Sequence, residues 1–149
     1  MPSDATNRAT REEWRELGFF YDVDDSSKAW RLVGSRAGLL RFRDLLVEYV
    51  AKPRNTILGE HDHYGPYMYL KIMTWSDAGL DSNAIFGTVV DLARLASLTE
   101  TKLKNVRPGV QVRIQEEFAS RSEYGLVFDV REEGFDPASA DPKLPSETS

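Results

Sequence analysis

The strongest restriction on the fold comes from an order of elements that occurs twice along the chain. In each case a strand pattern leads to a glycine, a hydroxyl residue, an amphipathic helix, a loop and a hairpin. Trp30–Ser35 can be laid over Asn83–Thr88, and at the same offset Leu39 meets Leu92. The other matched positions are Phe42 with Leu95, Leu45 with Leu98, and Val50 with Leu103. Each helix has to bury its apolar side, so we expect the two units to pack side by side.

We therefore predict an α+β fold with a largely antiparallel sheet and two long helices on one face. The repeats, at about 30–75 and 83–131, would arise by tandem duplication of a strand–helix–hairpin unit within a single domain, 1–131. Together they would form one sheet of six or more strands. A ferredoxin-like strand order is the alternative wiring, and the sequence does not choose between the two.

Local signals indicate where the helices begin and end. Ser35 and Thr88 are suitable caps for the two long helices, and Pro53 should end the first of them. Thr10 and Glu13 have the spacing of a capping box, which predicts a short helix that begins there. The residues before Thr10 are polar, and we expect them to be loose.

Composition excludes several classes of site. The chain has 149 residues and no cysteine, which rules out disulfides and thiolate zinc sites and suits a reducing cytoplasm. With 24 acids against 19 bases the net charge is -5, and no basic footprint for nucleic acid is present. Neither a secretory signal nor an apolar run long enough to cross a membrane is recognisable. The acidic, proline-containing tail, 132–149, should be disordered or lie on the surface.

The two histidines are the first candidates for chemistry. His61 and His63 flank Asp62, and on a strand both imidazoles would face one side, where they could meet a metal ion. A zinc or iron site normally needs a third protein ligand, and the neighbouring sequence signals none. The alternative is a polar hairpin arm whose histidines bind backbone or solvent. No catalytic motif is recognisable, and we expect neither a cofactor nor a bound metal.

The aromatic residues favour recognition of a macromolecule. Tyr67 and Tyr69 share a face of the predicted hairpin and are surrounded by charged residues. Such side chains contribute large contact areas at little entropic cost, as is typical of protein interfaces. Core packing is expected to take Phe20, Trp30 and Trp75.

A family resemblance points the same way. The run Gly34–Leu40, a leucine-spaced helix and the run Gly59–His63 resemble the small immunity proteins of bacterial polymorphic toxin systems. The resemblance covers about residues 30–75, and a diluted version recurs in 83–131. It implies a non-enzymatic cytoplasmic protein that binds and blocks a toxin domain.

Our leading hypothesis is a protein-binding module, an immunity protein that neutralises a toxin with a basic surface. The acids would pair with the partner's lysines or arginines, and the tyrosines would be the anchors. The predicted partner-binding residues are Asp24, Asp25, Glu60, His61, Asp62, His63, Tyr64 and Tyr67. One rival is a small metal-dependent enzyme that uses His61 and His63. The other is a structural protein that assembles into a homodimer or larger oligomer by pairing edge strands.

Overall fold

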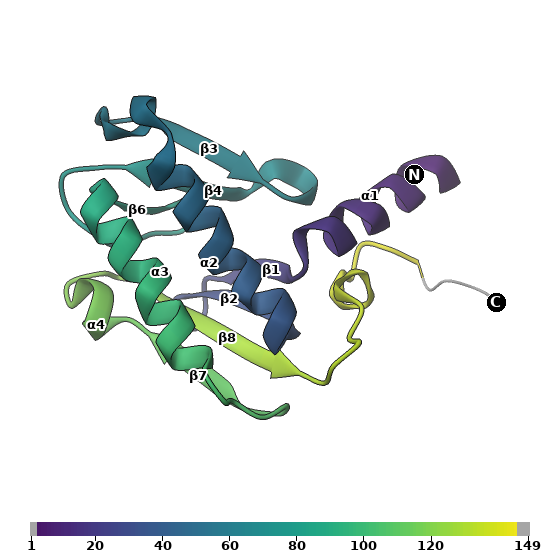
Figure 1. The fold of residues 1–149 in the computed structure, drawn as a ribbon. Coiled ribbons are helices and arrows are strands. Elements are labelled where there is room, and N and C mark those ends of the chain that lie inside the picture. The colour runs from purple at the N-terminus through teal and green to yellow at the C-terminus, as the bar shows by residue number, and fades with distance from the viewer. Residues whose placement is uncertain (1–2, 146–149) are drawn as a thin grey trace.

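The computed structural model describes residues 3–145, which form four α-helices and two four-stranded sheets (Figure 1). The helices are α1 (Asp4–Leu17), α2 (Arg36–Ala51), α3 (Val89–Leu103) and α4 (Glu116–Ala119). The first sheet has the order β1-β2-β8-β7, formed by Phe20–Asp24, Ala29–Ser35, Gly125–Arg131 and Gln111–Ile114. The second has the order β3-β4-β6-β5, formed by His61–Tyr64, Leu70–Thr74, Ile85–Gly87 and Gly79–Leu80.

The α+β class and the largely antiparallel pairing are confirmed, but the prediction of one large sheet is wrong. The central pairs β2–β8 and β4–β6 are parallel, and every outer strand is antiparallel to its neighbour. The hairpin before α2 joins the hairpin after α3, while the hairpin after α2 joins the one before α3. Because α2 carries the chain from one sheet to the other, a ferredoxin-like order cannot form. The duplication itself stays a prediction.

The two long helices lie side by side and run antiparallel across the strands (Figure 1). Arg36 at the start of α2 donates a hydrogen bond of 2.7 Å to the carbonyl of Leu103 at the end of α3. Further along, Arg43 is 2.6 Å from a carboxylate oxygen of Glu100. The apolar stripe predicted on α3 is buried, and so is that on α2 except for Val50, which is only partly buried. The buried residues are Leu39, Phe42, Leu46 and Tyr49 on α2 and Leu92, Leu95, Ala96, Thr99 and Leu103 on α3.

Both long helices begin at the predicted caps. The Ser35 hydroxyl accepts a hydrogen bond from the amide of Gly38, and Thr88 forms a capping box with Asp91. Lys52 follows the last residue of α2, as expected from Pro53. The interactions that cap these helices involve residues close together in the chain, which is why the sequence alone could locate the helix ends.

The expected start of the first helix is wrong. Helix α1 is capped by Ser3, whose hydroxyl accepts from the amide of Thr6 at 3.1 Å. The Thr10 hydroxyl instead donates a hydrogen bond to the carbonyl of Thr6, four residues earlier. This bond to the preceding turn is typical of a threonine inside a helix. Residues 4–9 are therefore helical, and Asn7 is buried.

The core prediction is confirmed for Phe20 and Trp30 and wrong for Trp75. Phe20 and Trp30 are buried, whereas 45% of Trp75 is exposed. Trp75 follows the last residue of β4, so the alternation of the strand no longer decides which way its side chain points. The hairpin turn also displaces Tyr67 from the strand, because β4 begins only at Leu70.

The described part of the tail, 132–145, packs against the rest of the protein. It contains a short 3₁₀ helix, Pro137–Ala140, and Ala138 is buried. Asp136 forms an ion pair of 3.0 Å with Arg15 of α1. The last residues of the predicted tail, 146–149, lie outside the described residues. Within 3–145, we find no helix with the length and apolar character that a membrane crossing requires.

The contact between Gly38 and Gly18 gives a stability prediction. A Cβ at Gly38 would collide with the carbonyl oxygen of Gly18, which ends α1 in the left-handed conformation. Alanine is normally preferred to glycine in a helix, but here we expect Gly38→Ala to lower the free energy of unfolding by about 1–3 kcal/mol. Urea denaturation measures the change, with Glu48→Ala on the exposed side of α2 as the control. A gain in stability would refute the close contact.

Candidate functional site

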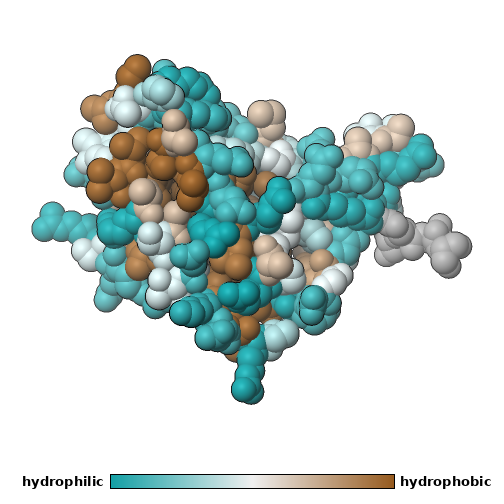
Figure 2. Space-filling model, viewed as in Figure 1, coloured by the Kyte–Doolittle hydropathy of each residue, from teal (hydrophilic) through white to brown (hydrophobic). Residues whose placement is uncertain are grey.

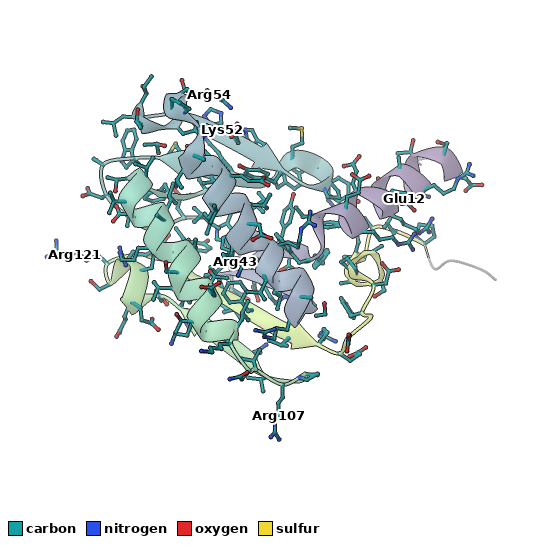
Figure 3. The ribbon with its side chains drawn as sticks, in the orientation of Figure 1. Glu12, Arg43, Lys52, Arg54, Arg107 and Arg121 are labelled. Carbon is teal, nitrogen blue, oxygen red and sulfur yellow. The ribbon has the colours of Figure 1, made fainter. Side chains whose placement is uncertain are left out.

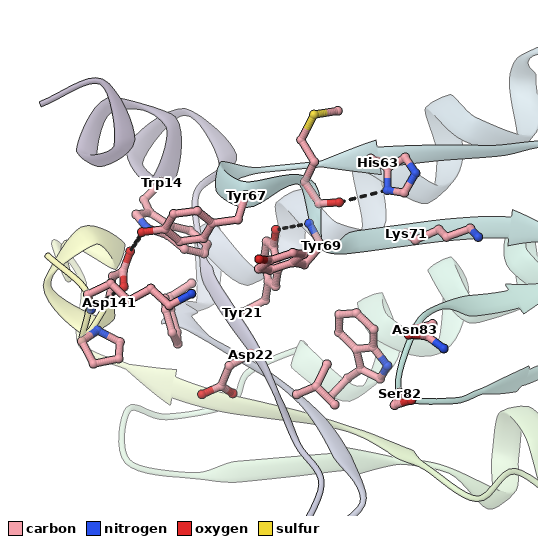
Figure 4. A pocket seen from close by; sticks show the side chains of 16 residues that line it. Trp14, Tyr21, Asp22, His63, Tyr67, Tyr69, Lys71, Ser82, Asn83 and Asp141 are labelled. Atoms are coloured by element: carbon pink, nitrogen blue, oxygen red, sulfur yellow. Dashed lines mark hydrogen bonds between the residues drawn. The ribbon is translucent and has the colours of Figure 1, made fainter. Parts of the chain in front are cut away.

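A cleft of about 680 Å³ lies between the edge strand β1, the β3–β4 hairpin, the 81–83 loop and residues 141–143 (Figure 4). We call it the aromatic cleft. Its lining residues are Trp14, Phe20, Tyr21, Asp22, Val23, Trp30, His63, Tyr67, Met68, Tyr69, Lys71, Ser82, Asn83, Asp141, Pro142 and Lys143. The volume is in the range of pockets that bind small molecules or receive the side chains of a partner.

Aromatic rings form both the floor and the rim of the aromatic cleft. Trp14 packs on Phe20 and Tyr21 with ring centroids 4.9 and 5.1 Å apart, and all three side chains are buried. Tyr67 and Tyr69 stand above them, with 39% and 62% of their surfaces exposed. The cleft therefore has a rigid apolar floor and an exposed aromatic rim.

The rim is formed by a turn whose left-handed backbone conformation is rare for residues other than glycine. Tyr67 and Met68 have φ angles of 66° and 55°, and Gly65 before them has a φ of 75°. The buried Tyr21 hydroxyl lies 2.7 Å from the carbonyl oxygen of Pro66 and accepts a 3.1 Å hydrogen bond from the amide of Tyr69. Burial raises the pKa of Tyr21, so its hydroxyl stays protonated and can donate. Strained turns that persist in this way are concentrated at functional sites.

Asp141 ties the tail to this rim. Its carboxylate is buried and accepts a hydrogen bond of 2.8 Å from the Trp14 indole and another of 2.8 Å from the Tyr67 hydroxyl. The other oxygen accepts from the backbone amide of Lys143 at 2.9 Å. Figure 4 shows Asp141 next to Trp14 and Tyr67 at one end of the cleft. One carboxylate thus fixes the rim, the floor and the tail relative to one another.

The arrangement suits binding through apolar contact with a few charged groups. Asp22 and Asp141 contribute carboxylates, and Lys71 and Lys143 contribute ammonium groups. Asp22 is held in place by the guanidinium of Arg31, at 3.0 and 3.2 Å. Aromatic surface with a small number of oriented polar groups is the usual composition of a recognition pocket.

Of the eight predicted partner-binding residues, His63 and Tyr67 line the aromatic cleft, and the other six do not. Asp24 and Asp25 lie at the turn between β1 and β2. Hydrogen bonds from the two serines that follow lower the pKa of Asp24 to about 2. Asp25 accepts a 2.6 Å hydrogen bond from the hydroxyl of Tyr124.

The acids of the β3 segment already have cationic partners within the chain. Asp62 lies 3.0 Å from Lys52 and 2.7 Å from Arg54. Figure 3 shows the two cations, Lys52 and Arg54, together at one end of the molecule. Burial acts to raise the pKa of Asp62, but the hydrogen bonds and charges of these two cations hold it below its ordinary value. Glu60 lies 3.6 Å from Arg54, and Tyr64 packs partly buried against the core.

The two histidines share an exposed face of β3, with ring centroids 5.2 Å apart. The Nδ1 of His61 lies 3.1 Å from the carbonyl oxygen of Gly59, and that of His63 lies 2.9 Å from the carbonyl oxygen of Met68. Throughout residues 3–145, no group of three or more histidine, aspartate or glutamate side chains is placed to hold a metal ion. His63 instead helps to hold the turn beside the aromatic cleft.

Sequence reasoning missed several residues of the aromatic cleft. Trp14 and Asp141 are 127 positions apart, and Tyr67 and Asp141 are 74 apart. No local pattern links residues at such separations, and the tail around Asp141 has the composition of a loose segment. Tyr69, which the sequence predicts to share a face with Tyr67, lines the cleft and is 62% exposed.

Removal of the Asp141 carboxylate should destabilise the protein. Asp141→Ala leaves the Trp14 N–H and the Tyr67 hydroxyl without their acceptor, and hydrogen bonds to charged groups contribute about 1.5–3 kcal/mol. We expect a loss of about 2 kcal/mol in the free energy of unfolding, measured by urea denaturation. Asp77→Ala, at an exposed loop position, should change it by less than about 0.5 kcal/mol. Equal effects of the two substitutions would contradict this role.

Tyr67 should titrate late. Burial and the hydrogen bond to Asp141 raise the pKa of Tyr67 from its ordinary 10.0 to about 12. A raised pKa means that the folded state holds this proton more tightly, so the resulting stability is complete below pH 10.0 and is lost towards pH 12. A tyrosinate absorbance difference between the wild type and Tyr67→Phe measures the pKa. In an Asp141→Asn background it should fall towards 10.0; an unchanged value would exclude the carboxylate as a cause.

Comparison with known proteins adds no further constraint. No family model matches this chain, and no curated protein or solved structure matches it either. The aromatic cleft is therefore the basis for a functional hypothesis, with its buried floor, its exposed rim and its two carboxylates.

Proposed function

We propose that this protein is a protein-binding module that receives a segment of its partner in the aromatic cleft. The observation that supports this most directly is the exposure of three consecutive apolar side chains at the rim. Tyr67, Met68 and Tyr69 are 39%, 61% and 62% exposed. Tyrosine and methionine are enriched at the centres of protein interfaces, where they supply large contact areas.

The way in which the rim is held also favours binding. The Tyr21 hydroxyl and the Asp141 carboxylate fix the turn before any partner arrives. A preorganised surface loses little conformational entropy on association, so more of the contact energy remains as affinity. The strained φ angles of Tyr67 and Met68 fit a turn whose conformation serves recognition.

The partner class that we propose is a bacterial toxin domain with a basic surface. The resemblance to small immunity proteins motivates this choice, and the net charge of -5 would favour encounter with a basic partner. In this proposal the protein is a non-enzymatic, cytoplasmic inhibitor. Asp24 and Asp25, outside the aromatic cleft, would act as charged residues at the periphery of the interface, which influence the association rate more than the final affinity.

A second exposed apolar surface supports the rival hypothesis of self-assembly. Figure 2 shows hydrophobic side chains gathered on the left of the molecule, over the end of α2 and the start of α3. Hydrogen bonds from Gly59 to Thr74 and from Trp75 to Gly87 bring the flanking loops together there. The exposed apolar residues of these segments are Val47, Ile57, Leu58, Trp75 and Val90. Patches of this kind mark contact sites, including contacts between copies of one chain.

A pair of substitutions separates the two surfaces. Met68→Asp places a charge at the rim, and aspartate tolerates the left-handed backbone at this position. We expect it to weaken partner binding at least about tenfold, because loss of a central hot-spot residue costs about 2 kcal/mol or more and about 1.4 kcal/mol is a factor of ten. Val90→Asp is the matched control on the other apolar surface, where 74% of the valine is exposed.

The partner is first captured from a lysate of the native host and identified by mass spectrometry, starting with the product of the adjacent gene. Titration calorimetry with the purified partner then compares the two variants with the wild type. Loss of affinity in Val90→Asp with retention in Met68→Asp would overturn the assignment of the aromatic cleft. A solution mass of a dimer or larger assembly that Val90→Asp converts to a monomer would favour self-assembly instead.

A further inference from the structure

We propose that Tyr67 and Tyr69 form a binding site for a cationic side chain of the partner, which Lys143 of the same chain occupies in the free protein. This inference rests on the proposed function and specifies the chemistry of the segment that the aromatic cleft receives. Its occupant is a lysine or arginine exposed on a polypeptide.

The position of Lys143 shows that the rim accepts a cation. Its Nζ lies 4.7 Å from the ring centroid of Tyr67 and 5.7 Å from that of Tyr69. The two rings are 6.0 Å apart and inclined at 33°. A cation within about 6 Å of an aromatic centroid is attracted by the negative potential of the ring face. Two rings therefore act on one ammonium group.

The ammonium group of Lys143 meets rings and not a carboxylate. Between residues 3 and 145, no carboxylate lies within ion-pair distance of Lys143. The residue is exposed, so a competing cation can reach the same rings without opening the core. An interaction of this kind at an exposed site is weak enough to be exchanged.

Lys143 is brought to the rim by its backbone and not by its side chain. Asp141 accepts a hydrogen bond from the Lys143 amide and another from the Tyr67 hydroxyl, so one carboxylate sets the positions of the lysine and the ring. The ring geometry is consequently kept when the lysine side chain moves away or is replaced.

The charges that line the aromatic cleft favour a cationic replacement. Besides His63 they comprise two carboxylates, Asp22 and Asp141, and two ammonium groups, Lys71 and Lys143. Asp22 is already paired with Arg31, whereas Asp141 accepts its hydrogen bonds from uncharged donors, the Trp14 indole, the Tyr67 hydroxyl and a backbone amide. When the Lys143 side chain leaves, an incoming lysine or arginine therefore meets the negative charge of Asp141 next to the rings. Arginine has the further advantage that its planar guanidinium stacks on aromatic faces.

Lys143 then acts as an internal competitor. The apparent affinity of a ligand falls in proportion to the fraction of molecules whose site is free. Replacing the lysine with a neutral residue should therefore strengthen the binding of an external cation. A gain in affinity on this replacement distinguishes a lysine that competes for the rings from one that lies beside them without blocking the site.

The test uses the full chain and two capped tripeptides, one with a central arginine and one with glutamine in its place. Binding is followed by nuclear magnetic resonance from the amide shifts of Tyr67, Met68 and Tyr69. We expect Lys143→Gln to bind the arginine peptide about two- to fivefold more tightly than the wild type, the factor that an exposed cation–π contact supplies. The glutamine peptide should bind neither protein detectably.

Three controls keep the inference falsifiable. Lys104→Gln removes an exposed lysine that does not line the aromatic cleft and should leave the peptide affinity unchanged. Tyr69→Leu should weaken binding of the arginine peptide about two- to fivefold, and Tyr69→Phe should keep it, because the ring face and not the hydroxyl meets the cation. Unchanged or weaker arginine binding in Lys143→Gln, or equal binding of the two peptides, would overturn the cation site.

The two proposals fail separately. A partner that depends on Met68 while the arginine peptide does not bind would leave the proposed function standing and remove the cation site. An arginine peptide that binds as expected while no partner depends on Met68 would do the reverse.

Discussion

Seven residues of β2, Ala29–Ser35, pair in parallel with seven residues of β8, Gly125–Arg131. This pairing joins two distant segments of the chain, because the hairpin before α2 and the hairpin after α3 become one sheet. The remaining two hairpins, β3–β4 and β5–β6, pair with each other as the second sheet. The tail that follows β8 packs against α1 and against β1, the edge strand of this sheet. The aromatic cleft lies in this region.

Two buried polar groups fix the positions of the side chains that form the aromatic cleft. The Tyr21 hydroxyl holds the turn at residues 65–69, and the Asp141 carboxylate joins Trp14, Tyr67 and the tail. Buried polar atoms are expensive unless they are hydrogen-bonded, so each of these groups selects one arrangement of its neighbours. The aromatic rim is thereby exposed without being free to collapse onto the floor below it.

The same features connect stability with recognition. Asp141 stabilises the folded state through its hydrogen bonds and also places Lys143 over the tyrosine rings. Residues 141–143 of the predicted acidic tail are thus part of the site. The composition of the tail predicted only a disordered or surface segment. Whether a carboxylate such as Asp141 stabilises the fold depends on the hydrogen-bond donors around it, and these come from distant parts of the chain.

The sequence by itself determined the elements whose signals are local. Ser35 and Thr88 cap α2 and α3, Pro53 follows the end of α2, and the apolar stripes of both helices, except for Val50, are buried as their spacing predicted. Periodicity specifies which side of an element is apolar, but it does not specify which strand will pair with which. Only the tertiary structure decided the division into two sheets, the exposure of Trp75 and the meeting of Trp14 with Asp141. The physical reason is that these outcomes depend on contacts between residues far apart in the chain, which no local pattern of side chains encodes.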